Sequence, residues 1–397
     1  MIRNRHTIVY LCNAISESIL AQRGITTDSP AATNKVLALV KAMRMQNLNC
    51  VVLSLGRGRQ NNSFKRYDAR LERSNQAATL YCKFWKMPIL THIVTMMSVL
   101  SLLNCLINRY PRITVLVYNR SYHYLPALLL ARLRGANVCL DLEDGYNIDG
   151  KGIFRILKNT LTRKIFEWLC PGGVMVSCSG LDRQIESRSA YVCYGISNNQ
   201  EIQHNKWKST RLQFLFSGTL LEEVGCLLLL EALSILRKDN PDLSKQLHVV
   251  VTGKGSCASE FKSFAATAPD WLTFHGAVSR KEYLDILRES HVGMSLRLSN
   301  FEMGATTFSS KVIEYAEHGL LVLTTRSSDV PTLFGETAVY LSEETPAGLA
   351  YLITGLIESR EYLKDLANSG RSRVNEICSP LKVGSEIKKM LLAEQLH

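Results

Sequence analysis

The sequence has few charged residues for its length and no closely spaced cysteine pair. Only 21% of its 397 residues are Asp, Glu, Lys or Arg, and it contains no CxxC pair and no Cys/His spacing suited to a metal. The low charge excludes a disordered chain, and the cysteine spacing excludes zinc-finger and dithiol motifs. Neither half contains a short repeat or a low-complexity segment, which excludes solenoid folds. These absences leave a globular protein.

Apolar residues and positive charge are both abundant. Apolar residues make up 46% of the chain, enough to build sizeable cores in two or three units. The 47 Lys and Arg against 35 Asp and Glu give a formal charge of +12, which favours an anionic partner. That partner is a nucleotide or an acidic membrane surface rather than nucleic acid, because no nucleic-acid-binding module is recognisable. The eleven cysteines lie mostly in apolar runs, which predicts reduced core residues in a cytoplasmic protein.

Two apolar segments need to be distinguished from membrane signals. Residues 1–18 place basic residues before a short apolar run but have no convincing cleavage site, so a buried first strand fits better. Residues 87–107 are long enough to cross a bilayer, yet they include His92, Asn104 and several Ser and Thr side chains. We therefore predict a helix that is either buried or lies on a membrane surface.

Apolar strands alternate with amphipathic helices along almost the whole chain, which predicts an α/β fold with parallel sheets. In the first half, strands are predicted at 6–13, 49–56, 113–119, 137–145, 172–179 and 189–195, with helices at 29–46 and 124–135. In the second half, strands are predicted at 212–218, 247–255, 272–278, 291–296 and 320–325, with helices at 226–239, 280–290 and 308–319.

A polar stretch from Tyr194 to Arg211 separates the two runs of alternation. We expect an N-terminal domain over 1–196, a linker over 197–210 and a C-terminal domain over 211–375. A C-terminal helix over 376–397 is expected to pack back on the first domain. Ligands of such sheets bind beyond the carboxyl ends of the strands, so a site is expected in a cleft between the domains.

One predicted helix carries charge in an unusual pattern. In FSSKVIEYAEHG, residues 308–319, Lys311 and Glu314 are three positions apart and leave the helix on the same side. Ser309 and Ser310 precede them at the helix N-terminus, where backbone N–H groups favour an anion. A diphosphate could meet these groups and the Lys311 ammonium, while the Glu314 carboxylate accepts hydrogen bonds from two ribose hydroxyls. The alternative is an ion pair on a solvated helix face.

The segment FSSKVIEYAEHGLLVLTT resembles the donor-binding region of family-4 glycosyltransferases of the GT-B fold, of the bacterial polysaccharide-biosynthesis type. The resemblance extends in order through FLFSGTLLEEVGCLLLLEAL, VVVTGKG and LTFHGAVSRKEYLDILRESHVGMSL. In the first half, SPAATNKVLALVKAMRMQNLNCVVLSLGRG and NVCLDLEDG are similar to the acceptor-side domain. The resemblance implies two Rossmann-like domains that face each other across the active-site cleft.

The resemblance also assigns roles to residues. It implies that Glu314 binds the ribose and Lys311 the diphosphate, and we treat these two as the catalytic pair. Ser309 and Ser310 would offer amides or hydroxyls to the phosphates. Gly218 would let the backbone approach the donor closely.

Gly253 lies in a turn that is either a contact near the base or a plain turn. Many relatives carry Arg and Lys after the first donor-domain strand, where this sequence has Thr219 and Val224. They also carry a glutamate where this sequence has Thr306. Lys311 must then supply the positive charge, with Arg297 or Lys254 as helpers; the other interpretation is loss of activity.

On the acceptor side, DLEDG places Glu143 and Asp144 at the end of a parallel strand, where many relatives have a histidine. Either acid could orient a sugar hydroxyl, and helix capping is an equal alternative for Asp144. Residues 57–73 contain six basic and two acidic residues around Phe64 and Tyr67. This segment is either a contact for phosphate headgroups and lipid-diphosphate acceptors or a solvated basic face.

We therefore expect a glycosyltransferase of the hexosyltransferase type that moves a sugar from a nucleotide sugar to a glycan or lipid-linked acceptor. It is expected to be retaining, without metal or other cofactor, and cytoplasmic with a peripheral contact at the inner membrane face. Two rivals remain: another nucleotide-sugar enzyme such as an epimerase, and a catalytically silent binding partner of another transferase.

Overall fold

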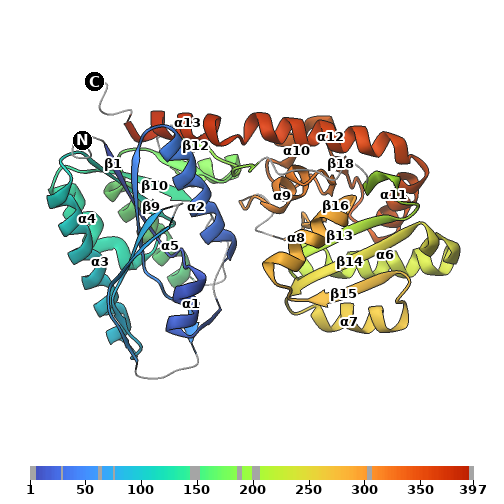
Figure 1. Ribbon diagram of the computed structural model, residues 1–397, viewed down its shortest axis with the longest axis horizontal. Coiled ribbons are helices and arrows are strands. Elements are labelled where there is room, and N and C mark those ends of the chain that lie inside the picture. The colour runs from blue at the N-terminus through green and yellow to red at the C-terminus, as the bar shows by residue number, and fades with distance from the viewer. Residues whose placement is uncertain are drawn as a thin grey trace. The chain divides into compact units, whose positions relative to one another are not determined.

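The computed structural model describes residues 6–27, 30–60, 65–74, 77–143, 153–185, 190–198, 206–301 and 306–392. The chain divides into two compact units (Figure 1). Unit 1 comprises Met1–Ile196 and Pro380–His397, and unit 2 comprises Ser197–Ser379. The chain therefore passes between the units twice, at residues 196–197 and 379–380.

Unit 1 is built on a sheet of eight strands in the order β12-β11-β10-β9-β1-β3-β7-β6. All neighbours are parallel except the edge pair β6–β7. The strands are β1 (Thr7–Cys12), β3 (Asn49–Ser54), β6 (Arg70–Arg73), β7 (Ala78–Tyr81), β9 (Ile113–Tyr118), β10 (Asn137–Leu142), β11 (Val174–Val176) and β12 (Ala190–Val192). The central strands β1, β9 and β10 are almost entirely buried, as expected of a sheet covered on both faces.

Helices cover both faces of this sheet. They are α1 (Glu17–Arg23), α2 (Pro30–Met45), α3 (Leu90–Arg109), α4 (Leu125–Leu133), α5 (Ile153–Leu169) and α13 (Pro380–Leu392), with 3-10 turns η1 (Tyr122–Tyr124) and η2 (Ser179–Gln184). Helices α2 and α13 lie side by side and fill one core with Leu39, Met43, Val383 and Ile387 (Figure 1). Gly384 allows this contact, because a Cβ atom there would lie 2.5 Å from the Ala42 carbonyl oxygen.

Helix α3 is the apolar segment that resembled a membrane span. It is the one helix among the described residues that is long and apolar enough to cross a membrane by length and composition. Thr95, Val99, Leu103 and Leu106 are buried, and the helix packs against α4, η1 and β8. Its opposite side is exposed.

The described residues of the basic segment, 57–60 and 65–73, include short strands. They are β4 (Arg59–Gln60), β5 (Arg66–Tyr67) and β6, which pair with β2 (Ile25–Thr27), β8 (Phe84–Trp85) and β7. Burial lowers the pKa of Arg57, whose guanidinium lies 2.6 Å from His123 Nε2. Arg66 stacks on the Trp85 ring at 4.4 Å. Phe64 lies outside the described residues. Arg57 is therefore partly buried and engaged in packing, whereas Arg59, Arg66, Arg70 and Arg73 are exposed, as on a solvated basic face.

Unit 2 is built on a parallel sheet of six strands in the order β15-β14-β13-β16-β17-β18. The strands are β13 (Leu212–Thr219), β14 (Leu247–Lys254), β15 (Leu272–Gly276), β16 (Val292–Ser295), β17 (Leu321–Thr324) and β18 (Val339–Tyr340). The helices are α6 (Cys226–Asp239), α7 (Ala258–Thr267), α8 (Arg280–Glu289), α9 (Lys311–Glu317), α10 (Val330–Phe334), α11 (Pro346–Glu358) and α12 (Arg360–Ile377). The 3-10 turns are η3 (Lys206–Lys208), η4 (Glu222–Val224), η5 (Pro241–Lys245) and η7 (Gly335–Thr337).

The strands and helices predicted from hydrophobic periodicity are present in both units. A capping box begins α8: Ser279 Oγ accepts from the Glu282 N–H, and the Glu282 carboxylate accepts from the Ser279 N–H. Two boundaries differ from the sequence interpretation. Ser197, expected in a linker, belongs to unit 2 and donates its N–H to the Cys378 carbonyl. The C-terminal segment is divided between α12 of unit 2 and α13 of unit 1 rather than forming one helix from 376.

The strand order of unit 2 reverses between β13 and β16. From β13 the chain moves to β14 and β15 on one side, and then to β16, β17 and β18 on the other. In an open α/β sheet, the carboxyl ends of the two strands at such a reversal form the usual ligand site. We therefore expect the functional site of unit 2 at the carboxyl ends of β13 and β16.

Candidate functional site

The carboxyl ends of β13 and β14 carry glycines. Gly218 and Gly253 face each other in the strand register, with φ angles of 129° and 139°. A Cβ atom on Gly253 would lie 1.9 Å from the Gly218 carbonyl oxygen, so only glycine fits there. A Cβ atom on Gly218 would lie 3.8 Å from Cε of Lys311. The bare backbone at the end of β13 therefore adjoins the lysine of α9.

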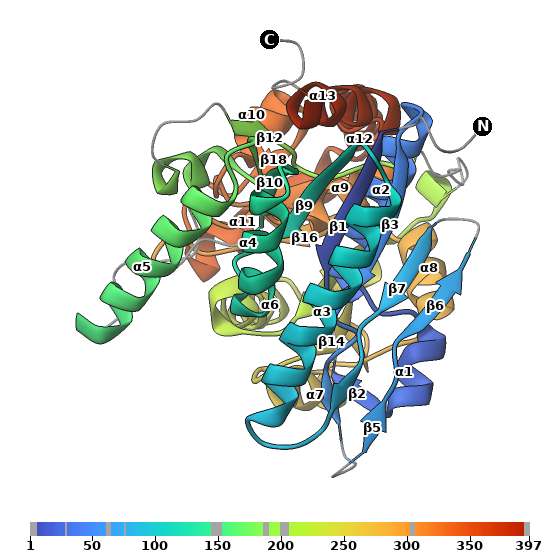
Figure 2. The same cartoon turned by 90° about the vertical axis from the view of Figure 1, so that its left-hand side faces the viewer.

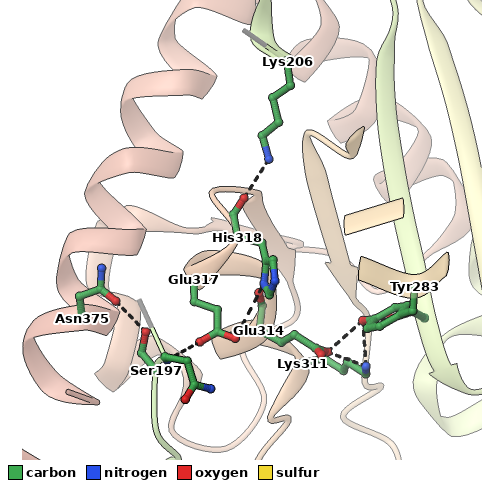
Figure 3. A network of polar contacts seen from close by, with 10 residues as sticks. Ser197, Lys206, Tyr283, Lys311, Glu314, Glu317, His318 and Asn375 are labelled. Carbon is green, nitrogen blue, oxygen red and sulfur yellow. Dashed lines mark hydrogen bonds and ion pairs between the residues drawn. The ribbon is translucent and has the colours of Figure 1, made fainter. Parts of the chain in front are cut away.

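A lysine, a glutamate and a tyrosine hydrogen bond to one another at this edge of the sheet (Figure 3). Lys311 Nζ lies 2.6 Å from Glu314 Oε2 and 2.9 Å from Tyr283 Oη. Tyr283 Oη donates to the same carboxylate oxygen at 2.9 Å. The ammonium also lies 4.5 Å from the centroid of the Tyr283 ring, within the range of a cation–π contact. We call Lys311, Glu314 and Tyr283 the triangle.

The triangle is held by residues beneath it. Ser217 Oγ lies 3.0 Å from Tyr283 Oη and 2.9 Å from Tyr315 Oη, which ties α8, α9 and β13 together. Tyr315 is fully buried, and Gly293 makes room for it because a Cβ atom there would lie 2.3 Å from the Tyr315 ring. The side chains of Lys311 and Glu314 are still 33% and 32% exposed. The charged groups of Lys311 and Glu314 are thus held in position by Tyr283 and the residues beneath it, and they remain accessible to solvent on the other side.

The surroundings set the protonation states of the triangle. Burial alone would raise the pKa of Glu314, but the Lys311 ammonium and the hydrogen bonds from Lys311 and Tyr283 outweigh it, so the pKa is lowered. Burial, and then the Glu314 carboxylate, raise the pKa of Tyr283 well above 10.0. Glu314 is therefore an ionised acceptor, and Tyr283 is a neutral donor, at neutral pH.

The far end of α9 is anchored by a buried lysine. Lys206 Nζ donates to the His318 carbonyl at 3.0 Å, and His318 Nδ1 lies 2.8 Å from the Glu314 carbonyl oxygen. Burial lowers the pKa of Lys206 to about 7. His291 supports this lysine: its Nε2 lies 2.7 Å from the Lys206 carbonyl oxygen, and burial lowers the pKa of His291 to about 4. The carbonyl end of a helix favours such a cation.

Glu317 joins α9 to the segment where the chain enters unit 2, and that segment is bonded in turn to the one where the chain leaves it (Figure 3). The Asn198 N–H donates to Glu317 Oε2 at 2.7 Å, just after the first crossing. Ser197 Oγ donates to Asn375 Oδ1 at 2.6 Å, just before the second crossing. Burial, and to a smaller extent the Glu314 carboxylate, raise the pKa of Glu317 to about 7. A carboxyl group one turn from Glu314 is therefore partly protonated near neutral pH.

The other residues predicted for donor binding lie around the same strand ends. Ser309 Oγ lies 2.8 Å from Ser295 Oγ at the end of β16. Ser310 is exposed at the position before α9, and Thr306 is half-buried ahead of it. The structure thus brings Ser309 to the strand reversal between β13 and β16.

The predicted auxiliary cations lie in different settings. Lys254 is exposed at the end of β14, in register with Thr219. Arg297 Nη1 lies 3.8 Å from Glu223 Oε1, so its charge is directed to that carboxylate. Val224, where relatives carry a lysine, packs against the apolar core of unit 2. Lys311 is consequently the cation that adjoins Gly218.

Unit 1 has its own polar cluster at the end of β10. Lys35 of α2 forms ion pairs with Glu143 and with Asp141, the latter at 3.1 Å, and Tyr10 donates to Asp141. The Glu143 N–H donates to Asn119 Oδ1 at 2.8 Å. Acids buried at a strand end need a cation or donors, and here Lys35 and Tyr10 provide them. Asp144, predicted as a partner of Glu143, lies outside the described residues.

Comparison with known proteins identifies the fold. Residues 211–359 match the family model described as Glycosyl transferases group 1. Along its whole length the chain superposes on HepE (Alr3699) of Anabaena in complex with UDP, with a TM-score of 0.69, 12% identity, and 98% of this chain and 100% of that chain covered. The chain has the GT-B fold.

Two further solved structures are similar. A glycosyltransferase from Rickettsia africae has a TM-score of 0.67 at 13% identity, with 98% of each chain covered. A putative UDP-N-acetylglucosamine 2-epimerase from Listeria monocytogenes has a TM-score of 0.60 at 12% identity, with 99% of this chain and 97% of that chain covered. No curated protein sequence matches the chain. At such low identity the likeness establishes the GT-B fold and not the reaction.

Three residues of this GT-B protein escaped the sequence interpretation. Tyr283 and Lys35 lie in predicted helices, but their partners are 31 and 108 residues away in the chain, at Glu314 and Glu143. Helix periodicity alone could have found Glu317, which lies four residues after the buried Ile313 and therefore on the buried side.

The described residues contain no group of three His, Cys, Asp and Glu side chains that could hold a metal ion. All eleven cysteines are present as thiols, and ten of them are buried. The ten buried ones pack as core side chains, as their apolar sequence context predicted, whereas Cys105 of α3 is exposed.

Protonation of Glu317 should make the stability of unit 2 depend on pH. A carboxyl group with a pKa of 4.5 when unfolded and about 7 when folded favours the folded state fully below 4.5. This contribution is lost as the pH rises toward 7, up to about 3 kcal/mol for a shift of this size. We expect the midpoint of unfolding to fall between pH 4.5 and 7 more steeply for the wild type than for Glu317→Gln. Parallel curves for the two proteins in calorimetry would contradict the buried-acid interpretation.

Proposed function

We propose that this protein is a glycosyltransferase that moves a sugar from a nucleoside-diphosphate sugar to a glycan or lipid-linked acceptor. We place it in family 4, as a hexosyltransferase in cell-surface polysaccharide assembly, cytoplasmic with a peripheral membrane contact. The observation that carries the proposal is the triangle beside the bare backbone of Gly218, at the strand reversal of a GT-B domain. HepE, of the same fold, is described in complexes with UDP and UDP-glucose.

The geometry of the triangle suits a nucleoside diphosphate. The Lys311 ammonium adjoins the glycine at the end of β13, so an approaching phosphate meets a charge without a side chain in its path. Glu314, one turn further along α9, stays ionised and can accept hydrogen bonds from two ribose hydroxyls. Before a donor binds, Tyr283 is hydrogen bonded to both residues and holds them in position.

Binding of a donor requires the Lys311–Glu314 ion pair to loosen. The pair is about one-third exposed, and pairs of that kind contribute little net stability, roughly 0–1 kcal/mol. The ammonium can therefore turn to a phosphate at low cost while its ring contact with Tyr283 is retained. A charge-assisted bond to the diphosphate then replaces the bond to the carboxylate.

The donor can be identified by thermal shift. The chain would be screened against UDP-, GDP-, ADP- and dTDP-sugars, because a ligand at 100 times its dissociation constant adds about 2.7 kcal/mol of stability. One nucleotide should stabilise the protein well above the others. An epimerase would convert its donor with no acceptor present, and a silent binding partner would bind donor without ever transferring or hydrolysing it.

Substitutions in α9 should weaken nucleotide binding selectively. Glu314→Ala should cost about 1.5–3 kcal/mol, or roughly 10- to 150-fold in affinity, because it removes hydrogen bonds to a charged group. Lys311→Ala should weaken nucleoside diphosphates more than monophosphates. Titration calorimetry with both nucleotides measures the difference.

A matched control is available on α13. Glu386 and Lys389 form an ion pair at 2.7 Å with the same spacing of three residues, far from the strand reversal of unit 2 in the chain. Glu386→Ala and Lys389→Ala should leave nucleotide affinity unchanged. Equal affinities in the wild type, Lys311→Ala and Glu314→Ala would remove the basis of the donor site.

We further propose that transfer needs no divalent metal and retains the anomeric configuration. The sequence has no DxD-type aspartate pair near the donor motif, so Lys311 is assigned to the leaving diphosphate. In the retaining reaction the departing phosphate oxygen takes the acceptor proton on the same face of the sugar. Activity should survive EDTA, and NMR of the product should show the donor's anomeric configuration. An absolute requirement for Mg²⁺ or Mn²⁺, or an inverted linkage, would refute the respective proposal.

A further inference from the structure

One face of the unit 1 sheet is covered by α3, α4 and α5, which lie next to one another (Figure 2). Helices α3 and α4 each bury one side, α5 buries Phe166 and Leu169 near its end, and all three helices expose apolar side chains four residues apart. The exposed pairs are Ile93 and Met97 of α3, Leu129 and Leu133 of α4, and Leu157 and Leu161 of α5. Leu157, Leu161 and Trp168 of α5 are each 61% exposed. We call these seven residues the apolar face.

Single exposed apolar residues are ordinary on soluble proteins, but a repeated stripe on three neighbouring helices is not. The stripes also differ from the core-facing sides of the same helices. In α3 the buried side is formed by Thr95, Val99, Leu103 and Leu106, so the exposed residues contribute nothing to the core. The apolar face therefore needs a different explanation from the packing of unit 1.

The charge of the chain segments that carry the apolar face is strongly one-sided. Between Glu72 and Asp141 the sequence contains eight Lys and Arg and no acidic residue at all. This stretch includes all of α3 and α4. Helix α5 carries Arg155, Lys158, Arg163 and Lys164 against Glu167 alone, and Glu167 lies 3.8 Å from Arg163. Lys158 and Lys164 are exposed beside Leu157, Leu161 and Trp168.

We infer that the apolar face docks onto the surface of an anionic lipid bilayer. Exposed leucines and a tryptophan flanked by lysines are the composition of a helix that lies in a membrane interface. The apolar side chains enter the headgroup region, and the basic residues meet lipid phosphates, at about 1 kcal/mol for each basic residue near the surface. A membrane with anionic lipid satisfies both features at once.

The same observations argue against two other occupants. In a symmetric dimer, this face would meet itself, so the basic residues of both copies would be brought together. A transmembrane insertion of α3 would remove Val99 and Leu103 from the core of unit 1, where both are fully buried. Docking on the surface keeps the fold intact.

The biological purpose of this docking rests on the proposed function, because an enzyme bound at the membrane surface can reach an acceptor that is anchored in lipid. The test of the docking is separate, because vesicle binding needs neither nucleotide nor acceptor. A chain that binds vesicles but no nucleotide would refute the proposed function alone. A chain that binds nucleotide but no vesicles would refute the membrane contact and leave the assignment of a nucleotide-sugar transferase intact.

The experiment is co-sedimentation of the full chain with vesicles of phosphatidylcholine, alone or mixed with phosphatidylglycerol. We expect binding to the mixed vesicles, release at high salt, and a shift of Trp emission to shorter wavelength that is lost in Trp168→Phe. Lys158→Gln with Lys164→Gln should weaken binding about 25-fold, taking fivefold for each charge. Leu157→Ser with Leu161→Ser should weaken it at least about tenfold.

Matched controls lie elsewhere in the chain. Leu381 is 59% exposed on α13, which packs with α2 in the separate core described above, so Leu381→Ser should bind as the wild type does. Lys238→Gln with Lys262→Gln removes two exposed lysines of unit 2 and should also have no effect. Wild-type nucleotide affinity in each variant would show that it is folded.

Several results would overturn the inference. These are equal binding to neutral vesicles, no vesicle binding at all, or wild-type binding by the Leu157 and Leu161 double variant. Retention in membranes after alkaline carbonate would indicate an integral span instead. A dimer in sedimentation equilibrium that the leucine substitutions dissociate would assign the apolar face to a second copy of the chain.

Discussion

The ion pair between Lys311 and Glu314, with the Tyr283 hydroxyl bonded to both, is the interaction on which the site in unit 2 depends. Two opposite charges on one helix turn would ordinarily be a weak solvated pair. Here the tyrosine contacts both partners, and it is itself held by Ser217 beneath. The pair therefore has a defined position at the strand reversal, with one side left accessible.

The backbone next to the Lys311–Glu314 pair is also fixed in position, by close contacts at the strand ends and by hydrogen bonds at the end of α9. Gly253 admits no Cβ atom because the Gly218 carbonyl occupies that space, and Gly218 leaves the Lys311 side chain uncovered. At the other end of α9, Lys206 bonds the last carbonyl and Glu317 accepts from the Asn198 N–H. Both of these contacts come from the first residues of unit 2. The short helix that carries the charges is consequently fixed at both ends.

Much of this could be predicted from the sequence. Periodicity located the strands and helices that build both sheets, because parallel strands buried on two faces form continuous apolar runs. The spacing of Lys311 and Glu314 likewise predicted that the two side chains lie on the same side of α9, where they form an ion pair. Tyr283 could not be found in this way, because its role depends on α8 and α9 meeting across β13. Lys35 is a similar case, since only the folded sheet brings α2 to the end of β10.

The chain boundaries show a second limit. The polar composition of residues 197–210 predicted a linker. Composition cannot distinguish polar side chains that form hydrogen bonds within a domain from polar side chains that face solvent. Ser197 and Asn198 are bonded within unit 2, and Lys206 is buried there. The composition of a segment shows whether it can face solvent. Whether the segment belongs to a folded unit depends on hydrogen bonds to residues far away in the chain.

The most direct test of the account is a crystal structure of the protein with a nucleoside diphosphate. The account predicts the diphosphate within hydrogen-bond distance of Lys311 Nζ and beside Gly218, the ribose hydroxyls on Glu314, and the 2.6 Å contact between Lys311 and Glu314 opened. Tyr283 should remain bonded to the Glu314 carboxylate. A nucleotide bound elsewhere on the chain, with the Lys311–Glu314 pair still closed, would contradict it.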